Sequence, residues 1–222
     1  MKRVLVFCQI LLIVLVAPAA RAGDLVMPEL AHGGFGVGLL FDFGVRGEFA
    51  RVGSSTLSYV PTRNMSGYGA EALLGTSIYG GDWAFHLGTN TEVTWLGQVA
   101  APSNSGGTNV SGTHWVSGLG AGLTLGQFFL FGSYDFAGSY SMVARTNWDE
   151  KVSYHLPRGF RAMVRWKFDW GMPFFDPEYW YVGLHLASRD FRSQHINDTR
   201  NALGGTNAFQ VESLGLSFGR SF

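Results

Sequence analysis

The chain is poor in cysteine and in charge, and each scarcity limits what the protein can be. Its 222 residues include one cysteine, Cys8, which lies inside the first apolar run. The remainder therefore has no disulfide, no thiolate nucleophile and no cysteine metal site. Charged residues make up 14% of the chain, with 16 basic and 16 acidic side chains. Nucleic-acid binding is not indicated, because it needs a clustered basic face.

Long hydrophobic runs are also missing after the N-terminus. A basic start precedes the apolar run at 4–16, and Ala20-Arg21-Ala22 fits an A-x-A cleavage site. This layout is typical of a secretory signal peptide, since a transmembrane helix needs roughly 20 apolar residues. We therefore expect three parts: a signal peptide at 1–22, a short periplasmic segment at 23–32 and the folded domain at 33–222.

What the sequence has instead is glycine and aromatic residues, with 31 Gly, 18 Phe, 8 Tyr and 7 Trp. In many segments bulky residues alternate with small or polar ones, which is the period of a β-strand. Trp83, Phe85 and Trp95 share one face of such a segment, and His86 and Glu92 share the other. Eight strands are predicted, at 33–45, 67–79, 82–96, 113–125, 127–140, 158–170, 179–190 and 209–222.

The connections between these strands alternate between long and short. Gly80-Gly81 and Gly126 indicate tight hairpin turns, whereas the segments at 102–112 and 193–206 are rich in Ser, Asn, Gly and Thr. Short periplasmic turns and longer extracellular loops are typical of transmembrane barrels. The sequence therefore predicts an all-β fold, an eight-stranded antiparallel up-and-down transmembrane β-barrel in the outer membrane of a Gram-negative bacterium.

Alternation alone does not say which face points outward, because a soluble secreted barrel alternates equally well. The interior of an eight-stranded barrel is only just wide enough for side chains to fill it. The aromatic-rich face would overfill that space, whereas the glycine-rich face fits. The charged residues of the glycine-rich face are expected in the lumen, as a structural ion-pair network or as a gate: Asp42, Glu71, Glu92, Asp135, Arg161, Arg165, Lys167 and Arg189.

The opposite face is expected to contact lipid and to carry two aromatic girdles, as transmembrane barrels do. In the fifth strand, Phe128, Tyr134, Phe136 and Tyr140 are predicted to point outward. The girdle residues are Trp83, Trp170, Trp180 and Phe222 at the turn end, and Trp95, Trp115 and Tyr140 at the loop end.

The last strand ends in a terminal aromatic residue that is preceded by apolar residues at alternate positions. Leu214, Leu216, Phe218 and Phe222 resemble the C-terminal assembly signal of outer-membrane proteins, and Arg220 departs from that pattern. In strand number, length and loop layout the chain is similar to the OmpA-type and OmpX-type eight-stranded barrels. The resemblance implies insertion by the outer-membrane assembly machinery, contact with outer-membrane lipids and lipopolysaccharide, and a monomeric barrel.

Candidate catalytic and metal sites are weak in this sequence. The six histidines lack metal-ligand spacing, and no cofactor site is indicated. His185 and Ser188 are the nearest approach to the His/Ser pair of lipid A-modifying barrels, but residues three apart on a strand face opposite sides.

A non-enzymatic barrel that contributes to membrane integrity or surface interaction is therefore the predicted function. The alternatives are a small-solute porin or channel with a gated lumen and, less favoured, a lipid A-modifying enzyme.

Overall fold

The computed structural model consists of β-strands and short connections. It describes residues 36–53, 63–80, 83–98, 109–145, 149–168, 179–196, 199–202 and 209–222. The expected signal peptide and periplasmic segment lie outside these residues. No helix in the described ranges is long and apolar enough to span a bilayer.

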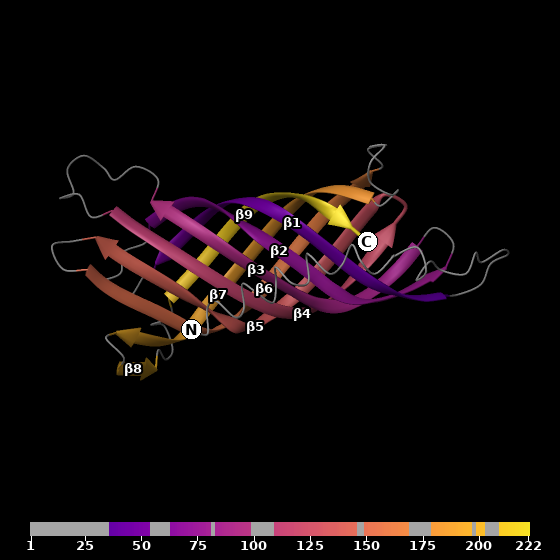
Figure 1. Ribbon diagram of the computed structural model, residues 1–222. Coiled ribbons are helices and arrows are strands. Elements are labelled where there is room, and N and C mark those ends of the chain that lie inside the picture. The colour runs from indigo at the N-terminus through magenta and orange to yellow at the C-terminus, as the bar shows by residue number, and fades with distance from the viewer. Residues whose placement is uncertain are drawn as a thin grey trace, which may run out of the picture.

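Eight long strands form one closed antiparallel ring, and a ninth short strand stands beside it (Figure 1). The ring is closed by pairing of β1 with β9, where Val45 lies opposite Phe218. Strands β6 and β7 also pair directly. The strands are β1 (Gly36–Gly53), β2 (Arg63–Gly80), β3 (Trp83–Gln98), β4 (Asn109–Leu125), β5 (Phe128–Arg145), β6 (Asp149–Phe168), β7 (Tyr179–Ile196), β8 (Thr199–Ala202) and β9 (Phe209–Ser221). The predicted all-β, eight-stranded up-and-down barrel is confirmed.

Burial alternates along these strands, as the sequence pattern predicts. In β9 buried and exposed positions alternate from Phe209 to Leu216, and the exposed ones are Gln210, Glu212, Leu214 and Leu216. The predicted strands are too short, mainly at the long-loop end. There β1 continues past residue 45 to Gly53, and β6 begins at Asp149 instead of 158. Polar residues in these extensions resemble loop sequence, and only backbone pairing shows them to be strands.

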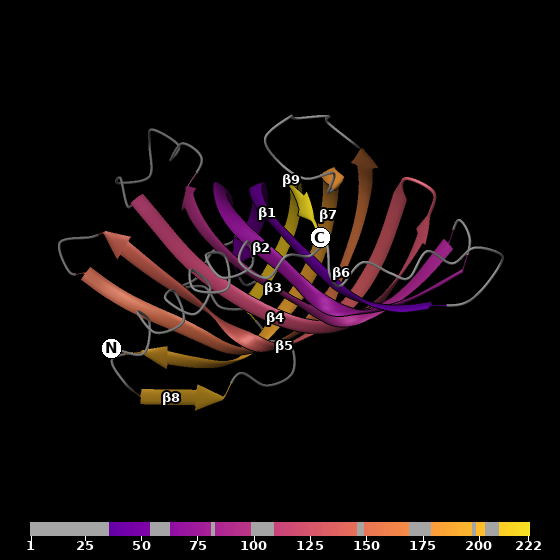
Figure 2. The same ribbon diagram turned by 45° about the vertical axis from the view of Figure 1, so that its right-hand side comes forward.

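The extra strand, β8, pairs only with the end of β7, from Ser193 to Ile196. At this point β9 has already left β7, since their pairing ends at Phe191 opposite Phe209. Figure 2 shows β8 beside the end of β7, apart from the ring. The strands therefore extend the barrel wall into a small sheet at its long-loop end.

A bulge in β5 corrects one sequence prediction. The register of β4 and β5 shifts between Ser117 and Gly118, so that Phe136 is unpaired, and Gly138 has a φ of +150°. An extra residue reverses the faces of the strand beyond it. Tyr140, predicted to face lipid, is instead completely buried in the lumen.

The short turn between β4 and β5 agrees with the sequence prediction. Gly126 has a φ of +56°, in the left-handed region that glycine adopts at no steric cost. The carbonyl of Gln127, the next residue in this turn, accepts a hydrogen bond from the backbone N–H of Lys167 in β6 at 2.7 Å. The turn is thus joined to β6 at the same end of the barrel.

Candidate functional site

The outer wall of the ring is apolar. Side chains that point away from the barrel axis remain exposed, such as Leu39 (66%), Phe160 (71%) and Leu216 (64%). Soluble proteins rarely expose continuous apolar surface of this extent. Ring closure also pairs the long strands on both sides, as hydrocarbon surroundings require. The barrel is therefore of the membrane-spanning kind found in bacterial outer membranes.

The apolar wall ends in a polar row toward the long loops. Arg51 lies opposite Glu212, and Arg158 lies opposite Asp190. At this level Gln210 donates a hydrogen bond from Nε2 to Asp190 Oδ1 at 3.1 Å. The outward face of β9 carries Leu214, Leu216 and Phe218, then Arg220, and Phe222 follows the strand. The span from Leu214 to Phe222 agrees with the roughly 9–11 residues of a tilted transmembrane strand. Beyond the polar row the strands leave the hydrocarbon layer.

Most expected girdle residues are on the outer wall. Trp83, Trp95, Trp115 and Phe222 are exposed there, and Trp180 stacks on Phe218 with ring centroids 5.2 Å apart. Trp170 lies outside the described residues. Tyr140 is the exception, because the β5 bulge turns it inward.

The structure places all eight charged residues singled out in the sequence on the inner face. Seven of them are at most 2% exposed, and Lys167 is partly exposed. Lys167 donates to Ser221 Oγ at 2.8 Å, near the short-turn end. Buried charges are tolerated when they are paired, so the partners of each determine what the set can do.

Glu92 is the centre of a group of ion pairs in the half of the barrel toward the long loops, called the upper group. Its Oε1 lies 2.7 Å from Arg189 Nη2, and its Oε2 lies 3.2 Å from Arg161 Nη1. Both arginines also contact Asp135, at 2.6 Å from Arg161 Nη2 and 2.5 Å from Arg189 Nε. Each cation is thus shared by two carboxylates, which fixes both guanidinium groups across the lumen.

Three members of this group were missed in the sequence. Arg46 donates from Nη1 to Glu92 Oε2, and its Nη2 lies 3.1 Å from Glu48 Oε2. His114 Nε2 lies 3.1 Å from Glu92 Oε1. Arg46 and Glu48 lie an even number of positions after Asp42 in β1, so the alternation of the sequence places them on the same inner face. They were missed because the predicted strand ended at residue 45.

Arg165 is the centre of a lower group. Its Nη1 donates to Asp42 Oδ2 at 2.5 Å, and its Nη2 donates to Glu71 Oε1 at 2.8 Å. The Tyr181 hydroxyl donates to the same Glu71 oxygen at 3.0 Å. The Arg165 guanidinium also lies 4.2 Å from the centroid of the Tyr181 ring. One cation therefore joins two carboxylates and an aromatic face.

Two histidines near the short-turn end are held by hydroxyl groups. The His86 ring lies between Ser77 Oγ and Thr124 Oγ1, each at 2.7 Å. His185 Nε2 lies 2.6 Å from Ser217 Oγ and 3.3 Å from Glu71 Oε2. Both rings fill space between the charged groups and the strands that surround them.

Apolar side chains close the lumen on the long-loop side of the charges. In this group Tyr154 stacks on Phe209 with ring centroids 3.7 Å apart, and Tyr140 donates to Met65 Sδ at 3.2 Å. Its members, called the upper plug below, are Ala50, Val52, Met65, Leu96, Val116, Tyr140, Tyr154, Phe191, Phe209 and Val211.

A smaller apolar group lies toward the short-turn end. Its members are Leu40, Leu73, Phe129, Phe131 and Met163. The Phe129 ring centroid lies 5.5 Å from the Arg165 guanidinium and 5.1 Å from Lys167 Nζ. Aromatic side chains thus fill the lumen on the long-loop side of the ion pairs and beside them. The sequence suggested instead that small residues would fill it.

The structure does not bring the candidate catalytic pair together. His185 is buried and Ser188 is exposed on the outer wall, so the one candidate pair is separated by the barrel wall. The contact between His185 and Ser217 is enclosed in the lumen, with His185 only 1% exposed. Among the described residues, no group of three or more His, Cys, Asp or Glu side chains could hold a metal.

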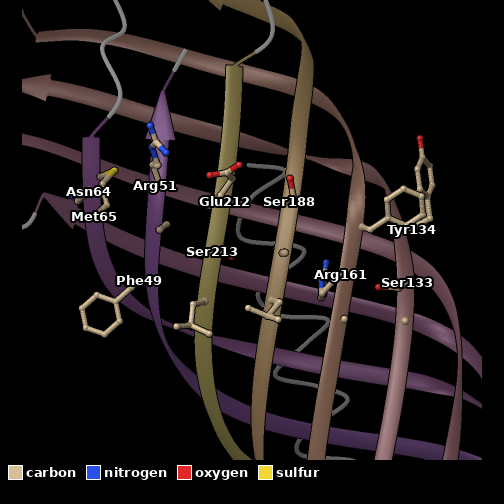
Figure 3. Close-up of a pocket in the computed structure, with 17 residues that line it drawn as sticks. Phe49, Arg51, Asn64, Met65, Ser133, Tyr134, Arg161, Ser188, Glu212 and Ser213 are labelled. Atoms are coloured by element: carbon tan, nitrogen blue, oxygen red, sulfur yellow. The ribbon is translucent and has the colours of Figure 1, made fainter. Parts of the chain in front are cut away.

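A shallow groove crosses the outer wall where the apolar surface meets the polar row. Figure 3 shows Phe49 and Tyr134 on opposite sides, with Arg51 and Glu212 along one edge. A Cβ added at Gly132, in the lining, would meet nothing within 4 Å. The groove is open to the surroundings of the barrel, and Arg161 of the ion-pair group is among the residues that line it.

The predicted assembly-signal residues lie on the outer wall of β9. Leu214 and Leu216 are exposed, and Phe222 is 40% exposed. The Phe222 backbone N–H donates to the carbonyl of Phe41 at 2.8 Å. Arg220 is placed with its guanidinium 5.0 Å from the centroid of the Phe222 ring. The end of the chain is thus built into the seam that closes the barrel.

Comparisons with known proteins give likenesses in structure alone. No family model matches the chain, and no curated protein matches it. Ail, the attachment invasion locus protein of Yersinia pestis, is 12% identical with a TM-score of 0.46, over 82% of this chain and 98% of Ail. Neisserial surface protein A is 16% identical with a TM-score of 0.40, over 82% of this chain and 95% of that one.

A third similar structure is the outer membrane protease OmpT from Escherichia coli. It is 8% identical with a TM-score of 0.36, over 88% of this chain and 98% of OmpT. These identities and TM-scores transfer no activity to this chain. The assignment of the fold rests on the strand pairing and the burial pattern described above.

Proposed function

We propose that this chain is an integral outer-membrane barrel with a sealed lumen, which contributes to membrane integrity or to interactions at the cell surface. In this proposal it neither conducts solutes nor catalyses a reaction. The observation that carries it is the burial of the ion pairs. Glu92, Asp135 and Arg165 are each 0% exposed, so water reaches them from neither end.

The lumen charges act in this proposal as a structural ion-pair network. The inner face carries five carboxylates and five basic side chains within the described residues: Asp42, Glu48, Glu71, Glu92 and Asp135 with Arg46, Arg161, Arg165, Lys167 and Arg189. A gate would have to separate several of these pairs and also displace the upper plug. Removing one partner of a buried pair costs about 3–5 kcal/mol, so thermal opening of several pairs is rare.

The purified barrel, reconstituted into planar lipid bilayers, is expected to give no conductance steps, because the lumen is closed by paired charges and by the upper plug. The measurement is single-channel current under an applied voltage. A water-filled porin, measured in the same bilayers, is the positive control. Reproducible steps from the folded barrel would support the small-solute channel instead.

For assembly we propose insertion by the outer-membrane assembly machinery as a monomer, in contact with outer-membrane lipids and lipopolysaccharide. Leu214, Leu216, Phe218 and Phe222 would form the signal that the machinery reads. Support comes from their shared position on the outer wall of β9, the strand that closes the ring with β1.

Replacing Phe222 with serine is expected to lower the amount of folded protein in the outer membrane while leaving its synthesis unchanged. The substitution removes the terminal aromatic ring, which lies 5.5 Å from the ring of Phe41. The measurement is the heat-dependent shift in gel mobility of membrane fractions. Gln210→Ala, at the other end of β9, is the matched control. Equal assembly of both variants would contradict the proposed role of Phe222.

The non-enzymatic part of the proposal has its own test. Deleting the gene is expected to leave the lipid A mass spectrum unchanged, since His185 and Ser188 lie on opposite faces of β7. A changed spectrum that depends on these two residues would favour the lipid A-modifying enzyme.

A further inference from the structure

We propose that His155 and His195 form a binding site for a divalent transition-metal ion at the long-loop end of the barrel. Copper(II) is expected to bind most tightly, followed by Ni²⁺ or Zn²⁺. The two imidazole rings lie with their centroids 4.5 Å apart and their planes at 43°. They are 40 positions apart in the chain, and the pairing of β6 with β7 brings them together.

The strand register places this histidine pair on one face. His155 lies opposite Ser193, and Ser153 lies opposite His195. Directly opposed residues of antiparallel strands point to the same side of the sheet. The pair also lies beyond Arg158 and Asp190 in the polar row. It therefore lies on the aqueous side of the membrane boundary.

The separation of the rings suits a shared ion. An imidazole nitrogen binds zinc at about 2.0–2.1 Å, so two nitrogens on one ion lie at most about 4 Å apart. Rings with centroids 4.5 Å apart can meet that limit. Imidazole suits copper, nickel and zinc, and among first-row divalent ions affinity is highest for Cu²⁺. Hard ions such as Ca²⁺ and Mg²⁺ prefer oxygen ligands and are not expected here.

Two buried polar atoms at the histidine pair lack a hydrogen-bond partner, which supports the binding of an ion there. His195 Nε2 and Ser193 Oγ are both buried without a hydrogen-bond partner among the described residues. Ser193 is 2% exposed and shares the face of His155. A metal ion would satisfy the nitrogen, and a water molecule on that ion would satisfy the hydroxyl.

The site would supply two protein ligands and leave the other positions to water. No third His, Cys, Asp or Glu side chain of the described residues completes it. An open site of modest affinity, and not a structural metal centre, is therefore expected.

The test uses the full chain without a polyhistidine tag, folded in detergent and titrated with Cu²⁺ at neutral pH. Electron paramagnetic resonance should show about one ion per barrel with nitrogen coupling from two imidazoles, and only a large excess of Zn²⁺ should displace it. His155→Asn combined with His195→Asn should abolish this signal. Each single substitution should weaken binding at least about tenfold, and Ser193→Ala should weaken it by up to about tenfold.

Ser141→Ala is the matched control, because the Ser141 hydroxyl hydrogen-bonds to the hydroxyl of Ser153, on the neighbouring strand, at 3.2 Å. It should bind Cu²⁺ like the original chain. The gel-mobility shift of each variant confirms that the barrel has folded; if the double variant does not fold, the single variants decide. Absence of stoichiometric binding, or binding that survives in the folded histidine variants, would overturn the site.

Discussion

Replacing Glu92 with glutamine is expected to lower the free energy of unfolding by about 3–5 kcal/mol. The substitution keeps the shape of the side chain and removes its charge. Arg46, Arg161 and Arg189 then share two carboxylates, those of Glu48 and Asp135, in a closed lumen. Arginine cannot release its proton in compensation. Urea unfolding in lipid vesicles, followed by tryptophan fluorescence, measures the loss.

Glu212→Gln is the control for this prediction. Glu212 lies opposite Arg51 on the outer wall and is exposed, so its removal should cost no more than about 1 kcal/mol. A second substitution, Arg46→Gln, should restore part of the stability of Glu92→Gln, because it rebalances the group. Neighbouring residues in one network are not additive, so the double variant should lose less than the sum of both losses. Equal losses for Glu92→Gln and Glu212→Gln would show that the ion-pair network contributes little to stability.

Alternation along the strands was enough to predict the ring, its strand number and the side on which Asp42 and Glu92 lie. This works because the two faces of a membrane barrel wall meet opposite surroundings, lipid outside and packed side chains inside. Each strand then repeats the same contrast. A one-residue error in register would expose every charge to lipid, which makes the pattern strict in the middle of the membrane.

The pattern fails where the strands leave the membrane. Above the polar row both faces can be polar, so the sequence of β6 before Arg158 resembles a loop. Local backbone changes also reverse the faces there: β5 has the bulge at Phe136, and Leu156 in β6 has a φ of +58°. Such reversals depend on one residue's backbone conformation, and Ala137-Gly138-Ser139 offers no bulky side chain to reveal them.

The partners of the charges were beyond the reach of the sequence. Arg165 and Asp42 are 123 positions apart, and nothing in their neighbours indicates that they meet. Tilt and stagger of the strands set the height at which each side chain enters the lumen. Residues on β1 and β6 therefore come to one level only after the ring closes. For the same reason, the contact between His155 and His195 could not be predicted from the sequence.

Replacing Arg165 with methionine is expected to lower the free energy of unfolding by about 3–5 kcal/mol as well. The variant leaves Asp42 and Glu71 without the guanidinium that joins them. Both carboxylates then remain in a closed lumen without their shared cation, and breaking a buried pair in this way is costly.

The measurement is urea unfolding of Arg165→Met and of the original chain in the lipid vesicles used for Glu92→Gln. Arg220→Met, on the outer wall beside Phe222, is the control for loss of an arginine and should show only a small change. Arg165→Lys should retain part of the stability, because an ammonium group keeps the charge and loses the paired donor geometry. Equal losses for Arg165→Met and Arg165→Lys would mean that the charge contributes little and that the guanidinium acts mainly by packing against Tyr181.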